Sequence, residues 1–401
     1  MSHIVVIGAG QAGASLVAKL RSLGHAGQIT LIGEEPAPPY QRPPLSKAYL
    51  LGEMSEERLY LRPEDFYAEQ NITLRLGSPV TEIDAAGKTV KVGSDLLAYD
   101  QLALTTGSIP RRLPGAIGGD LQNVFTVRTL ADVDAMRPQM VAGKSVLIVG
   151  GGYIGLEAAA VAAKLGLQVT LVEMAERILQ RVAAPETSAF FRDLHESQGV
   201  DLREGTGLER LVGENAVRGA VLSDGTELEL DLVIVGVGIA PATDLAKEAG
   251  LGLDNGICVD EFGQTSTQGI WAAGDCASLP YRGTRIRLES VQNAIDQAEA
   301  VAANMLGAAA PYLPKPWFWS DQFDVKLQIA GLNTGYDAVV ARREDAAVSH
   351  WYYAGETLLA VDAMNAPRAY MVGKRLIETG KSPNRATVSD PETDLKSLLR
   401  A

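Results

Sequence analysis

VLIVGGGYIGLE, residues 146–157, is the stretch that decides the fold of this chain. Its four apolar residues at 146–149 predict a buried strand, and Gly150, Gly152 and Gly155 give the spacing G-x-G-x-x-G before an alanine-rich helix. In such a turn the first glycine makes the tight bend, the second lets backbone approach a pyrophosphate, and the third lets the helix pack closely on the strand. The helix N-terminus adds unpaired N–H groups for the phosphates. The stretch therefore predicts a dinucleotide-binding unit.

A complete copy of the same signal opens the chain. Residues 4–7 predict a strand, and GAGQAG at 8–13 supplies the glycine turn before a second helix. Each copy has an acidic residue about 20 residues past its turn, Glu34 in the first and Glu173 in the second, where a carboxylate accepts ribose hydroxyls. Strand, turn, helix, second strand and acid in this order are far more specific than the glycine spacing alone. The chain is therefore expected to bind two dinucleotides.

Composition and charge narrow the class of protein. The 401 residues are 46% hydrophobic and 21% charged, as in ordinary globular proteins, and the net charge of −13 argues against nucleic acids or anionic membranes as partners. No apolar run approaches the ~18–20 residues of a membrane span. The first strand begins almost at residue 1, so we expect no cleavable signal. Cys258 and Cys276 lie in no disulfide framework and no C-x-x-C spacing. We expect a cytoplasmic protein.

The order of segments predicts an α/β fold with two Rossmann-like dinucleotide-binding domains and a C-terminal α+β domain. Two similar stretches, TGSIP ending at residue 110 and GIAP ending at residue 241, indicate crossings between the two nucleotide units. The last domain is expected to hold a small antiparallel sheet, one helix, and a polar tail that is mobile from residue 381 until a short terminal helix at 394–399. The predicted domains are a discontinuous first unit at 1–109 and 236–311, a second unit at 110–235, and a C-terminal domain at 312–401.

Other segments carry reactive or polar residues whose roles stay open on local grounds. The loop YQRPPLSK at 40–47 is held extended by its paired prolines, and Ser46 is a plausible helix N-cap. Asp275 ends a strand, where it could bind the hydroxyls of a ribityl chain or simply cap a turn or helix. The histidines fall in no ligand spacing, so we expect no metal site; they are His3, His25, His195 and His350.

Together, these motifs resemble the flavin-dependent NAD(P)H reductases of the glutathione-reductase structural class. The most similar branch is the oxygenase-coupled NADH:ferredoxin reductases, the putidaredoxin reductase-like group. The resemblance extends to about residue 380. Its branch-specific parts are the loop at 42–47 and WFWSDQ at 317–322, whereas the glycine turns are shared by the wider class.

The resemblance implies a non-covalent FAD in the first unit and NADH in the second. Pro44 would flank the isoalloxazine, Lys47 would approach its reactive edge paired with Glu157, and Trp319 would lie near its outer edge, where electrons leave. The implied FAD-binding residues are Gly8, Gly10, Ala12 and Gly13 at the pyrophosphate, Glu34 at the ribose, Lys47 at the flavin, Val80 at the adenine, Arg128 near the pyrophosphate, Asp275 at the ribityl chain and Val291 at the ring's carbonyl edge. The implied NADH-binding residues are Gly150, Gly152, Tyr153, Ile154, Gly155 and Glu173.

The chemistry of the residues supports the same direction of electron flow. A nicotinamide gives two electrons as hydride, and a flavin can release them singly to a one-electron carrier. Residues 36–51 contain no cysteine, and Cys276 and Cys258 are expected to be small packed residues, so no internal thiol relay is predicted. Glu173 would repel a 2′-phosphate and favour NADH, although Arg177 and Arg181 leave NADPH open.

The expected function is therefore an NADH:ferredoxin reductase that serves a haem monooxygenase or a ring-hydroxylating dioxygenase, with a transient iron–sulfur ferredoxin partner. Rubredoxin reductase and NADH oxidase share its motifs, and an apoptosis-inducing-factor-like signalling protein is a more remote alternative. We expect a monomer or weak dimer. Lys47 and Glu157 could instead form a purely structural ion pair, and Trp317 or Trp319 could be core. Docking on an acidic ferredoxin would need a local basic patch, for which the candidates are Arg285, Arg287, Arg342, Arg343, Lys374 and Arg375.

Overall fold

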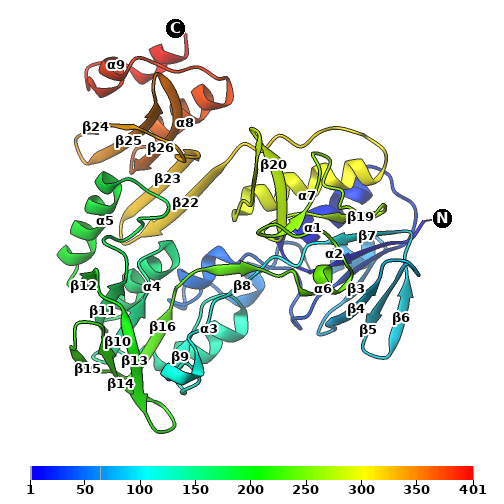
Figure 1. Ribbon diagram of the computed structural model, residues 1–401, viewed down its shortest axis with the longest axis horizontal. Helices are drawn as coiled ribbons and strands as arrows, with labels where there is room; N and C mark the ends of the chain where they lie inside the picture. Colours follow the sequence, from blue (N-terminus) through cyan, green and yellow to red (C-terminus); the bar gives the residue numbers. More distant parts are fainter. Residues whose placement is uncertain (1, 64, 401) are drawn as a thin grey trace. The chain divides into compact units, whose positions relative to one another are not determined.

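The computed structural model describes residues 2–63 and 65–400, so the predicted outer bounds at residues 1 and 401 lie outside it. The mixed α/β fold expected from the sequence is confirmed (Figure 1). The chain divides into two compact units, each assembled from separate segments. Unit 1 comprises Met1–Arg42, Ser55–Ile109 and Ile239–Pro316, and unit 2 comprises Pro43–Met54, Pro110–Gly238 and Trp317–Ala401. The finer division into three domains stays a prediction.

Unit 1 is built on a parallel sheet of order β19-β7-β1-β2-β3, with α1 and α7 packed together against it. Its central strands are fully buried Ile-, Val- and Leu-rich runs, as expected for a parallel sheet covered on both faces. The elements are β1 (Ile4–Ile7), α1 (Gln11–Ser22), β2 (Ile29–Ile32), β3 (Ile72–Arg75), β7 (Gln101–Leu104), β19 (Ile270–Ala272) and α7 (Val291–Met305).

Smaller sheets and short helices complete unit 1. One antiparallel sheet contains β4 (Val80–Asp84), β5 (Thr89–Val92) and β6 (Asp95–Ala98), and another sheet contains β18 (Ile257–Cys258), β20 (Ala277–Tyr281) and β21 (Thr284–Ile286). The strands β8 (Ser108–Pro110) and β17 (Ile239–Pro241), which hold the two Gly- and Pro-containing stretches, pair with each other. The helices are η2 (Glu56–Leu59), α2 (Asp65–Glu69) and α6 (Asp244–Glu248).

Unit 2 contains a second parallel sheet, of order β12-β11-β10-β16-β9. Its strands are β9 (Val124–Phe125), β10 (Ser145–Val149), β11 (Gln168–Glu173), β12 (Asp201–Glu204) and β16 (Leu232–Val235). A three-stranded antiparallel sheet packs beside it and consists of β13 (Leu208–Gly213), β14 (Val217–Leu222) and β15 (Glu227–Glu229). The helices are η1 (Pro43–Ser46), η3 (Gly115–Ile117), α3 (Leu130–Met136), η4 (Arg137–Gln139), α4 (Tyr153–Lys164) and α5 (Pro185–Ser197).

The C-terminal part of unit 2 is the expected antiparallel sheet, of order β22-β23-β26-β25-β24. Helix α8 packs on β23 and β26, and its apolar side joins the core around Trp351. The elements are β22 (Trp317–Gln322), β23 (Val325–Gly331), β24 (Ala338–Glu344), β25 (Ala347–Ala354), β26 (Thr357–Met364), α8 (Pro367–Glu378), α9 (Arg385–Ser389) and η5 (Leu395–Leu399).

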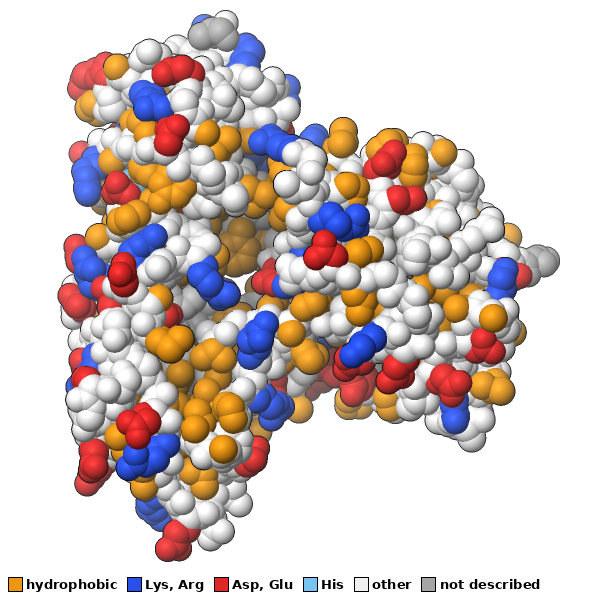
Figure 2. Space-filling model, viewed as in Figure 1, with side chains coloured by type: hydrophobic (Ala, Val, Ile, Leu, Met, Phe, Trp, Pro, Cys, Tyr) orange, Lys and Arg blue, Asp and Glu red, His pale blue; other side chains and the backbone are white. Residues whose placement is uncertain are grey.

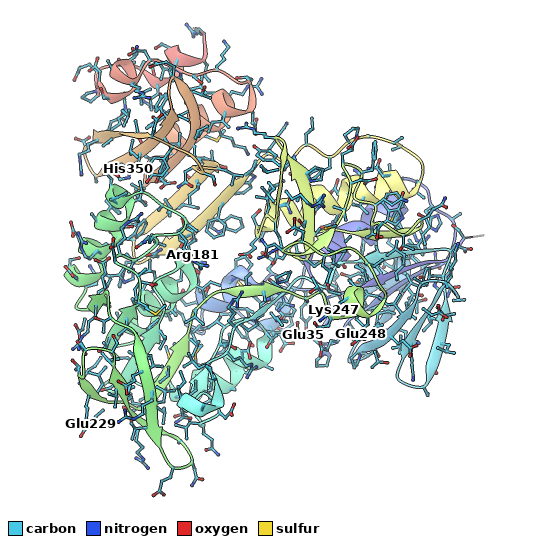
Figure 3. The ribbon with its side chains drawn as sticks, viewed as in Figure 1. Glu35, Arg181, Glu229, Lys247, Glu248 and His350 are labelled. Carbon is cyan, nitrogen blue, oxygen red and sulfur yellow. The ribbon has the colours of Figure 1, made fainter. Side chains whose placement is uncertain are left out.

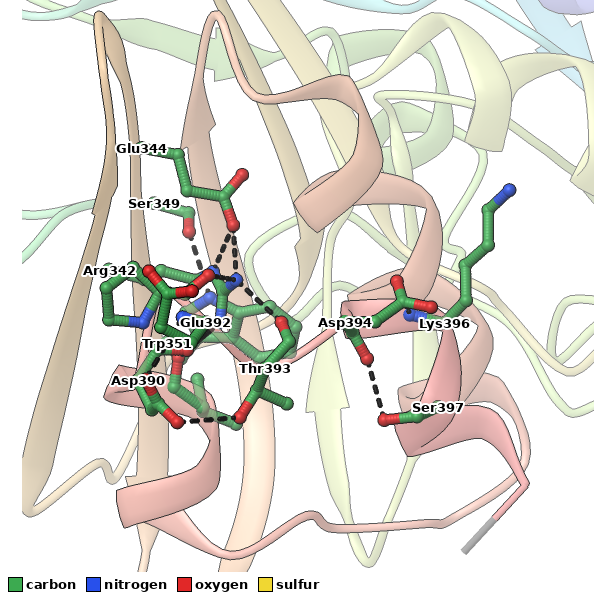
Figure 4. A network of polar contacts seen from close by, with 12 residues as sticks. Arg342, Glu344, Ser349, Trp351, Asp390, Glu392, Thr393, Asp394, Lys396 and Ser397 are labelled. Carbon is green, nitrogen blue, oxygen red and sulfur yellow. Dashed lines mark hydrogen bonds and ion pairs between the residues drawn. The ribbon is translucent and has the colours of Figure 1, made fainter.

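The polar tail expected to be mobile is instead packed on this sheet. Val388, Leu395 and Leu398 are buried in its core. Arg342 binds the tail backbone: its Nη1 donates to the carbonyl of Val388 at 3.1 Å, and its Nη2 and Nη1 reach three further carbonyls between residues 390 and 393 (Figure 4). Its side chain is 3% exposed. The prediction that Arg342 belongs to a surface docking patch is therefore wrong.

None of the helices within the described residues combines the length and the apolar composition needed to cross a membrane.

Candidate functional site

The first glycine turn joins β1 to α1 in unit 1. Gly8 has a φ of +108°, and a Cβ there would lie 2.2 Å from the carbonyl oxygen of Thr105. A Cβ on Gly13 would lie 2.0 Å from the carbonyl oxygen of Gly8, whereas a Cβ on Gly10 would meet no atom within 4 Å. Gly10 precedes the helix without a side-chain cap, which leaves the helix N-terminus to a phosphate. The turn is closed where strand and helix meet and open where a pyrophosphate would approach.

The second turn, between β10 and α4 in unit 2, repeats this geometry. Gly150 also has a φ of +108°, and its Cβ would lie 2.5 Å from the carbonyl oxygen of Gly236. A Cβ on Gly155 would lie 2.0 Å from the carbonyl oxygen of Gly150, and one on Gly152 would meet nothing within 4 Å. Gly152 precedes α4 without a side-chain cap. Both turns therefore fit the pyrophosphate of a dinucleotide.

The two carboxylates predicted to read ribose hydroxyls have different surroundings. Glu34 follows β2 and is exposed. Glu173 ends β11, and its two oxygens accept the backbone N–H groups of Gly151 at 2.7 Å and Ala175 at 2.8 Å. These bonds hold the Glu173 carboxylate against the glycine turn, and its role toward a ribose stays a prediction.

The two arginines near Glu173 are also placed differently. The Nη1 of Arg177 donates to the Oγ of Ser188 at 2.5 Å, so its guanidinium is anchored on α5. Arg181 is exposed on the loop before α5 (Figure 3). Arg181 is therefore the more available cation for a 2′-phosphate.

Other predicted flavin-binding residues of unit 1 lie at or near the ends of its elements. Asp275 follows β19, and its Oδ2 accepts the hydroxyl of Ser108 at 2.9 Å. Ala12 lies in the first turn of α1, with its Cβ 3.0 Å from where a Cβ on Gly274 would stand. Val80 begins β4. The glycine at 274 thus lets α1 approach closely the strand end that carries Asp275.

Two more predicted flavin contacts lie at helix N-termini. Val291 is the first residue of α7, whose N-cap Ser290 accepts the N–H of Asn293 at 3.1 Å. Arg128, in unit 2, precedes the Thr129 cap of α3, and its own N–H donates to the Asp132 carboxylate at 3.0 Å. The role of each toward FAD stays a prediction.

The structure brings Lys47 and Glu157 into direct contact within unit 2. Glu157 lies one turn into α4 and is 5% exposed. Its Oε2 accepts the ammonium of Lys47 at 2.6 Å and the hydroxyl of Ser46 at 2.8 Å. Its Oε1 accepts the hydroxyl of Ser320 at 2.7 Å. Such a buried carboxylate is stable only with this many donors. Pro44 lies in the same 3₁₀ turn, η1, and its carbonyl accepts the backbone N–H of Lys47 at 3.0 Å.

Ser46 and Ser320 are contacts of this centre that sequence reasoning missed. Ser46 was expected as an N-cap, but it ends η1 and its hydroxyl points to Glu157. Ser320 lies in the WFWSDQ segment beside Trp319, on the opposite face of β22. The period-two alternation of a strand could have separated these two faces.

The faces of β22 have different neighbours. The ring of Phe318 lies 4.9 Å from that of Tyr153, at the start of α4. On the other face, the rings of Trp317 and Trp319 lie 5.4 Å apart, and the Lys374 ammonium lies 5.0 Å from the Trp317 ring. Both tryptophans are half-buried, so neither is a fully enclosed core residue.

A buried polar cluster lies near the start of α4. Thr187 donates its hydroxyl to Asp362 at 2.8 Å and lies 2.8 Å from the Nδ1 of His350 (labelled in Figure 3). Tyr352 donates to the same carboxylate. Burial raises the pKa of Asp362 to about 6 and, with the nearby Arg343 charge, lowers the pKa of His350 to about 4. The cluster therefore favours a neutral imidazole in the folded protein.

Tyr153, at the second glycine turn, has its hydroxyl buried near this cluster. Among the described residues its buried hydroxyl has no hydrogen-bond partner, and burial followed by the Asp362 charge raises its pKa well above the ordinary value. Its neighbour Ile154 is 42% exposed, and its role toward NADH stays a prediction. In the first turn of α4, the Tyr153 hydroxyl is therefore packed inside the protein and Ile154 faces solvent.

The structure also shows the surroundings of the cysteines and of the basic residues considered for docking. Cys276 is fully buried, and burial raises the pKa of its thiol; both cysteines are free.

Arg285 donates to the carbonyls of Val259 and Ser278, so it is bound along its own sheet. On the face shown in Figure 2, acidic and basic side chains are interspersed. Within the described residues no cluster of three acidic, His or Cys side chains could hold a metal ion.

Comparison with known proteins gives the family. Residues 2–298 match the model of the pyridine nucleotide-disulphide oxidoreductases, and residues 317–399 match the reductase C-terminal model. The ferredoxin reductase subunit of 5,5′-dehydrodivanillate O-demethylase from Sphingobium sp. is 43% identical, covering 99% of this chain and 98% of that one. Rubredoxin-NAD(+) reductase of Ectopseudomonas oleovorans is 38% identical, covering 91% and 96%.

The solved structures agree with the sequence relatives. The reductase in the covalent putidaredoxin reductase–putidaredoxin complex matches with a TM-score of 0.96 at 40% identity, over 100% of this chain and 98% of that chain. The chain therefore belongs to the pyridine nucleotide-disulphide oxidoreductase family and, within it, to the putidaredoxin reductase-like ferredoxin reductases, which are oxidoreductases that use FAD and NAD(P)H.

Proposed function

We propose that this protein carries electrons from NADH, through bound FAD, to a small iron–sulfur ferredoxin that feeds an oxygenase, either a haem monooxygenase or a ring-hydroxylating dioxygenase. FAD supplies the step between two-electron and one-electron chemistry. The observation that carries the proposal is the combination of two complete dinucleotide turns with no thiol pair. Similarity over the full length to reductases of ferredoxin type supports the choice of acceptor.

The cysteines argue for direct transfer to an external acceptor. Disulfide-reducing relatives need two thiols side by side next to the flavin. Here Cys276 is enclosed, with its Sγ 3.4 Å from the carbonyl oxygen of Ala273, and Cys258 is half-buried on β18. Residues 36–51 contain no cysteine. Electrons that enter from NADH therefore leave to a partner rather than to an internal disulfide.

The predicted site residues divide between the two cofactors. The turn of Gly8, Gly10, Ala12 and Gly13 receives the FAD pyrophosphate, a role supported by the open space at Gly10. The FAD-binding set is completed by Glu34, Val80, Arg128, Asp275 and Val291, with Pro44 and Lys47 beside the flavin ring. The NADH-binding set is Gly150, Gly152, Tyr153, Ile154, Gly155 and Glu173.

Glu173 makes NADH the preferred donor in this proposal. A carboxylate held against the turn by two N–H groups leaves its remaining lone pairs for the ribose hydroxyls and repels a 2′-phosphate. Lys47 and Glu157 act as the charged pair that faces the reacting rings, and Trp319 marks the side where electrons leave. We propose a cytoplasmic protein, monomeric or weakly dimeric, whose partners include neither nucleic acid nor membrane.

The test uses the purified flavoprotein under anaerobic conditions. NADH should bleach the visible flavin absorbance, and the reduced enzyme should reduce a ferredoxin of the oxygenase type faster than it reduces rubredoxin, peroxide or a disulfide. Faster turnover with rubredoxin would support the alternative suggested by the rubredoxin reductase relative. Poor turnover with every acceptor, together with a gel-filtration shift on adding NADH, would favour a signalling protein of the apoptosis-inducing-factor kind.

A further inference from the structure

The hydrogen bonds around Glu157 do not stop at Ser320. The Oγ of Ser320 accepts the Nε2 amide of Gln322 at 3.1 Å, and the Oε1 of Gln322 lies 2.9 Å from the Nε2 of His195 on α5. Ser320, Gln322 and His195 are each 0% exposed. A buried chain of side chains therefore runs from α5, across β22, to the carboxylate on α4.

This chain of hydrogen bonds has a single direction. Because Gln322 uses its amide N–H₂ toward Ser320, its carbonyl oxygen must accept, so His195 donates from Nε2. Burial lowers the pKa of His195 and outweighs the Gln322 hydrogen bond, which acts to raise it. The lowered pKa keeps the imidazole neutral. The Ser320 hydroxyl receives one bond and gives its own proton to Glu157 Oε1. Every donor in the chain points toward the carboxylate, and such chains polarise their members cooperatively.

The chain of hydrogen bonds ends inside the protein. Within the described residues the Nδ1 of His195 is buried and has no hydrogen-bond partner. In the Nε2-protonated form this nitrogen is an acceptor, and no described side chain stands beside it to supply a proton, so the chain of hydrogen bonds does not continue through it. A neutral amide at Gln322 also relays protons poorly. The arrangement is therefore suited to orienting Glu157 and not to conducting protons.

The two oxygens of the Glu157 carboxylate accept hydrogen bonds from different parts of the chain. Oε2 receives Lys47 and Ser46, both from the segment at 43–54, and Oε1 receives Ser320 from the C-terminal sheet. Ser320 thereby fixes the rotation of the carboxylate and leaves Oε2 turned to the ammonium. Without it, Oε1 would be a buried anionic oxygen with no donor, a costly state that the side chain would leave by rotating.

We infer that Ser320, backed by Gln322 and His195, is a positioning residue for hydride transfer from NADH, acting through Glu157 on Lys47. The inference rests on the proposed role of the Lys47–Glu157 pair. It gives β22 two functions. The face with Phe318, Ser320 and Gln322 orders the NADH-side centre, and the face with Trp317 and Trp319 serves the electrons that leave.

The experiment compares variants by anaerobic stopped flow. Ser320→Ala should slow the bleaching of the flavin by NADH about tenfold, the effect of removing one hydrogen bond to a charged group. Gln322→Met, which leaves the serine hydroxyl without its donor, should give a smaller loss. Ser320→Thr keeps a hydroxyl and should restore most of the rate. Ser349→Ala removes a hydroxyl that is 2% exposed in the same sheet, away from Glu157, and is the matched control.

Two readouts separate positioning from a general structural defect. The NAD⁺ dissociation constant, measured by titration, and the delivery of electrons from chemically pre-reduced enzyme to ferricyanide should be unchanged in Ser320→Ala. The reaction of Lys47 with an amine-specific reagent, followed by mass spectrometry, should be severalfold faster in Ser320→Ala than in Ser349→Ala, because its partner carboxylate is released.

The outcomes also separate this inference from the function on which it rests. If Glu157→Gln and Lys47→Met slow NADH oxidation while Ser320→Ala does not, the positioning role is refuted and the pair keeps its role. If Glu157→Gln and Lys47→Met leave the rate unchanged, the proposed role of the pair itself fails. An equal loss of NAD⁺ binding and rate in Ser320→Ala, with no rescue by Ser320→Thr, would show a structural defect and overturn the inference.

Discussion

The pH dependence of stability should change sharply when His350 is replaced by glutamine. In the folded protein burial lowers the pKa of His350 from 6.5 to about 4, so the stability it contributes is complete above pH 6.5 and is lost as the pH falls toward 4. Asp362 acts in the opposite direction. Its pKa is raised from 3.8 to about 6, so the folded state takes up a proton first and gains stability as the pH falls from 6 toward 3.8.

These two effects nearly cancel in the natural protein. Each pKa shift changes the free energy of unfolding by about 3 kcal/mol, because a shift of one pKa unit corresponds to about 1.4 kcal/mol. Removing the imidazole leaves the Asp362 effect alone. Relative to the natural protein, His350→Gln should therefore gain about 2 kcal/mol of unfolding free energy between pH 7 and pH 4.5. Asp362→Asn should show the opposite sign over the same interval.

The assay is urea unfolding of the flavoprotein at the two pH values, with the difference between variant and natural protein taken at each. Comparing these differences in unfolding free energy between the two pH values removes any loss of packing energy that is independent of pH. Ser349→Ala, a neutral change on the same strand as His350, should show no pH-dependent difference. A constant difference for His350→Gln across the interval would refute the view that the buried cluster holds this imidazole neutral.

Three further variants test the cofactor and exit residues. Gly155→Ala would place a Cβ 2.0 Å from the carbonyl oxygen of Gly150, so NADH should no longer bleach the flavin at a measurable rate while dithionite still does; normal NADH kinetics would contradict the second turn as its site. Glu173→Ala combined with a basic residue beside it should move the ratio of kcat/KM values toward NADPH, and an unchanged ratio in steady-state kinetics would argue against its reading role. Trp319→Ala should spare the bleaching by NADH and slow ferredoxin reduction, whereas equal loss of both rates would indicate a structural role.

The local parts of this fold could be predicted well from the sequence. Each glycine turn is decided within about 30 residues, because strand, turn and helix are neighbours in sequence and the glycines meet specific backbone atoms. The acidic residue after each turn follows from the same unit. Glu173 accordingly ends β11 and Glu34 follows shortly after β2, although only the structure shows that the Glu173 oxygens are bound to backbone N–H groups.

The contacts that sequence reasoning missed join distant segments. Ser320 and Glu157 are separated by 163 positions, and no periodicity links a serine in a strand to a carboxylate in a helix that far away. The pairing of Lys47 with Glu157 came from family resemblance for the same reason. Arg342 was misjudged because arginine is usually a surface residue, and only tertiary structure shows the four tail carbonyls that satisfy its guanidinium.

The central claim is that electrons pass from NADH through the flavin to an iron–sulfur partner without any thiol. It is tested most directly by rapid anaerobic mixing of NADH-reduced enzyme with a ferredoxin, using the natural protein and a Cys258→Ser/Cys276→Ala variant. Rapid ferredoxin reduction at the same rate by both proteins is the predicted result. Loss of ferredoxin reduction in the cysteine-free variant, or faster transfer to a disulfide than to ferredoxin by the natural protein, would contradict the claim.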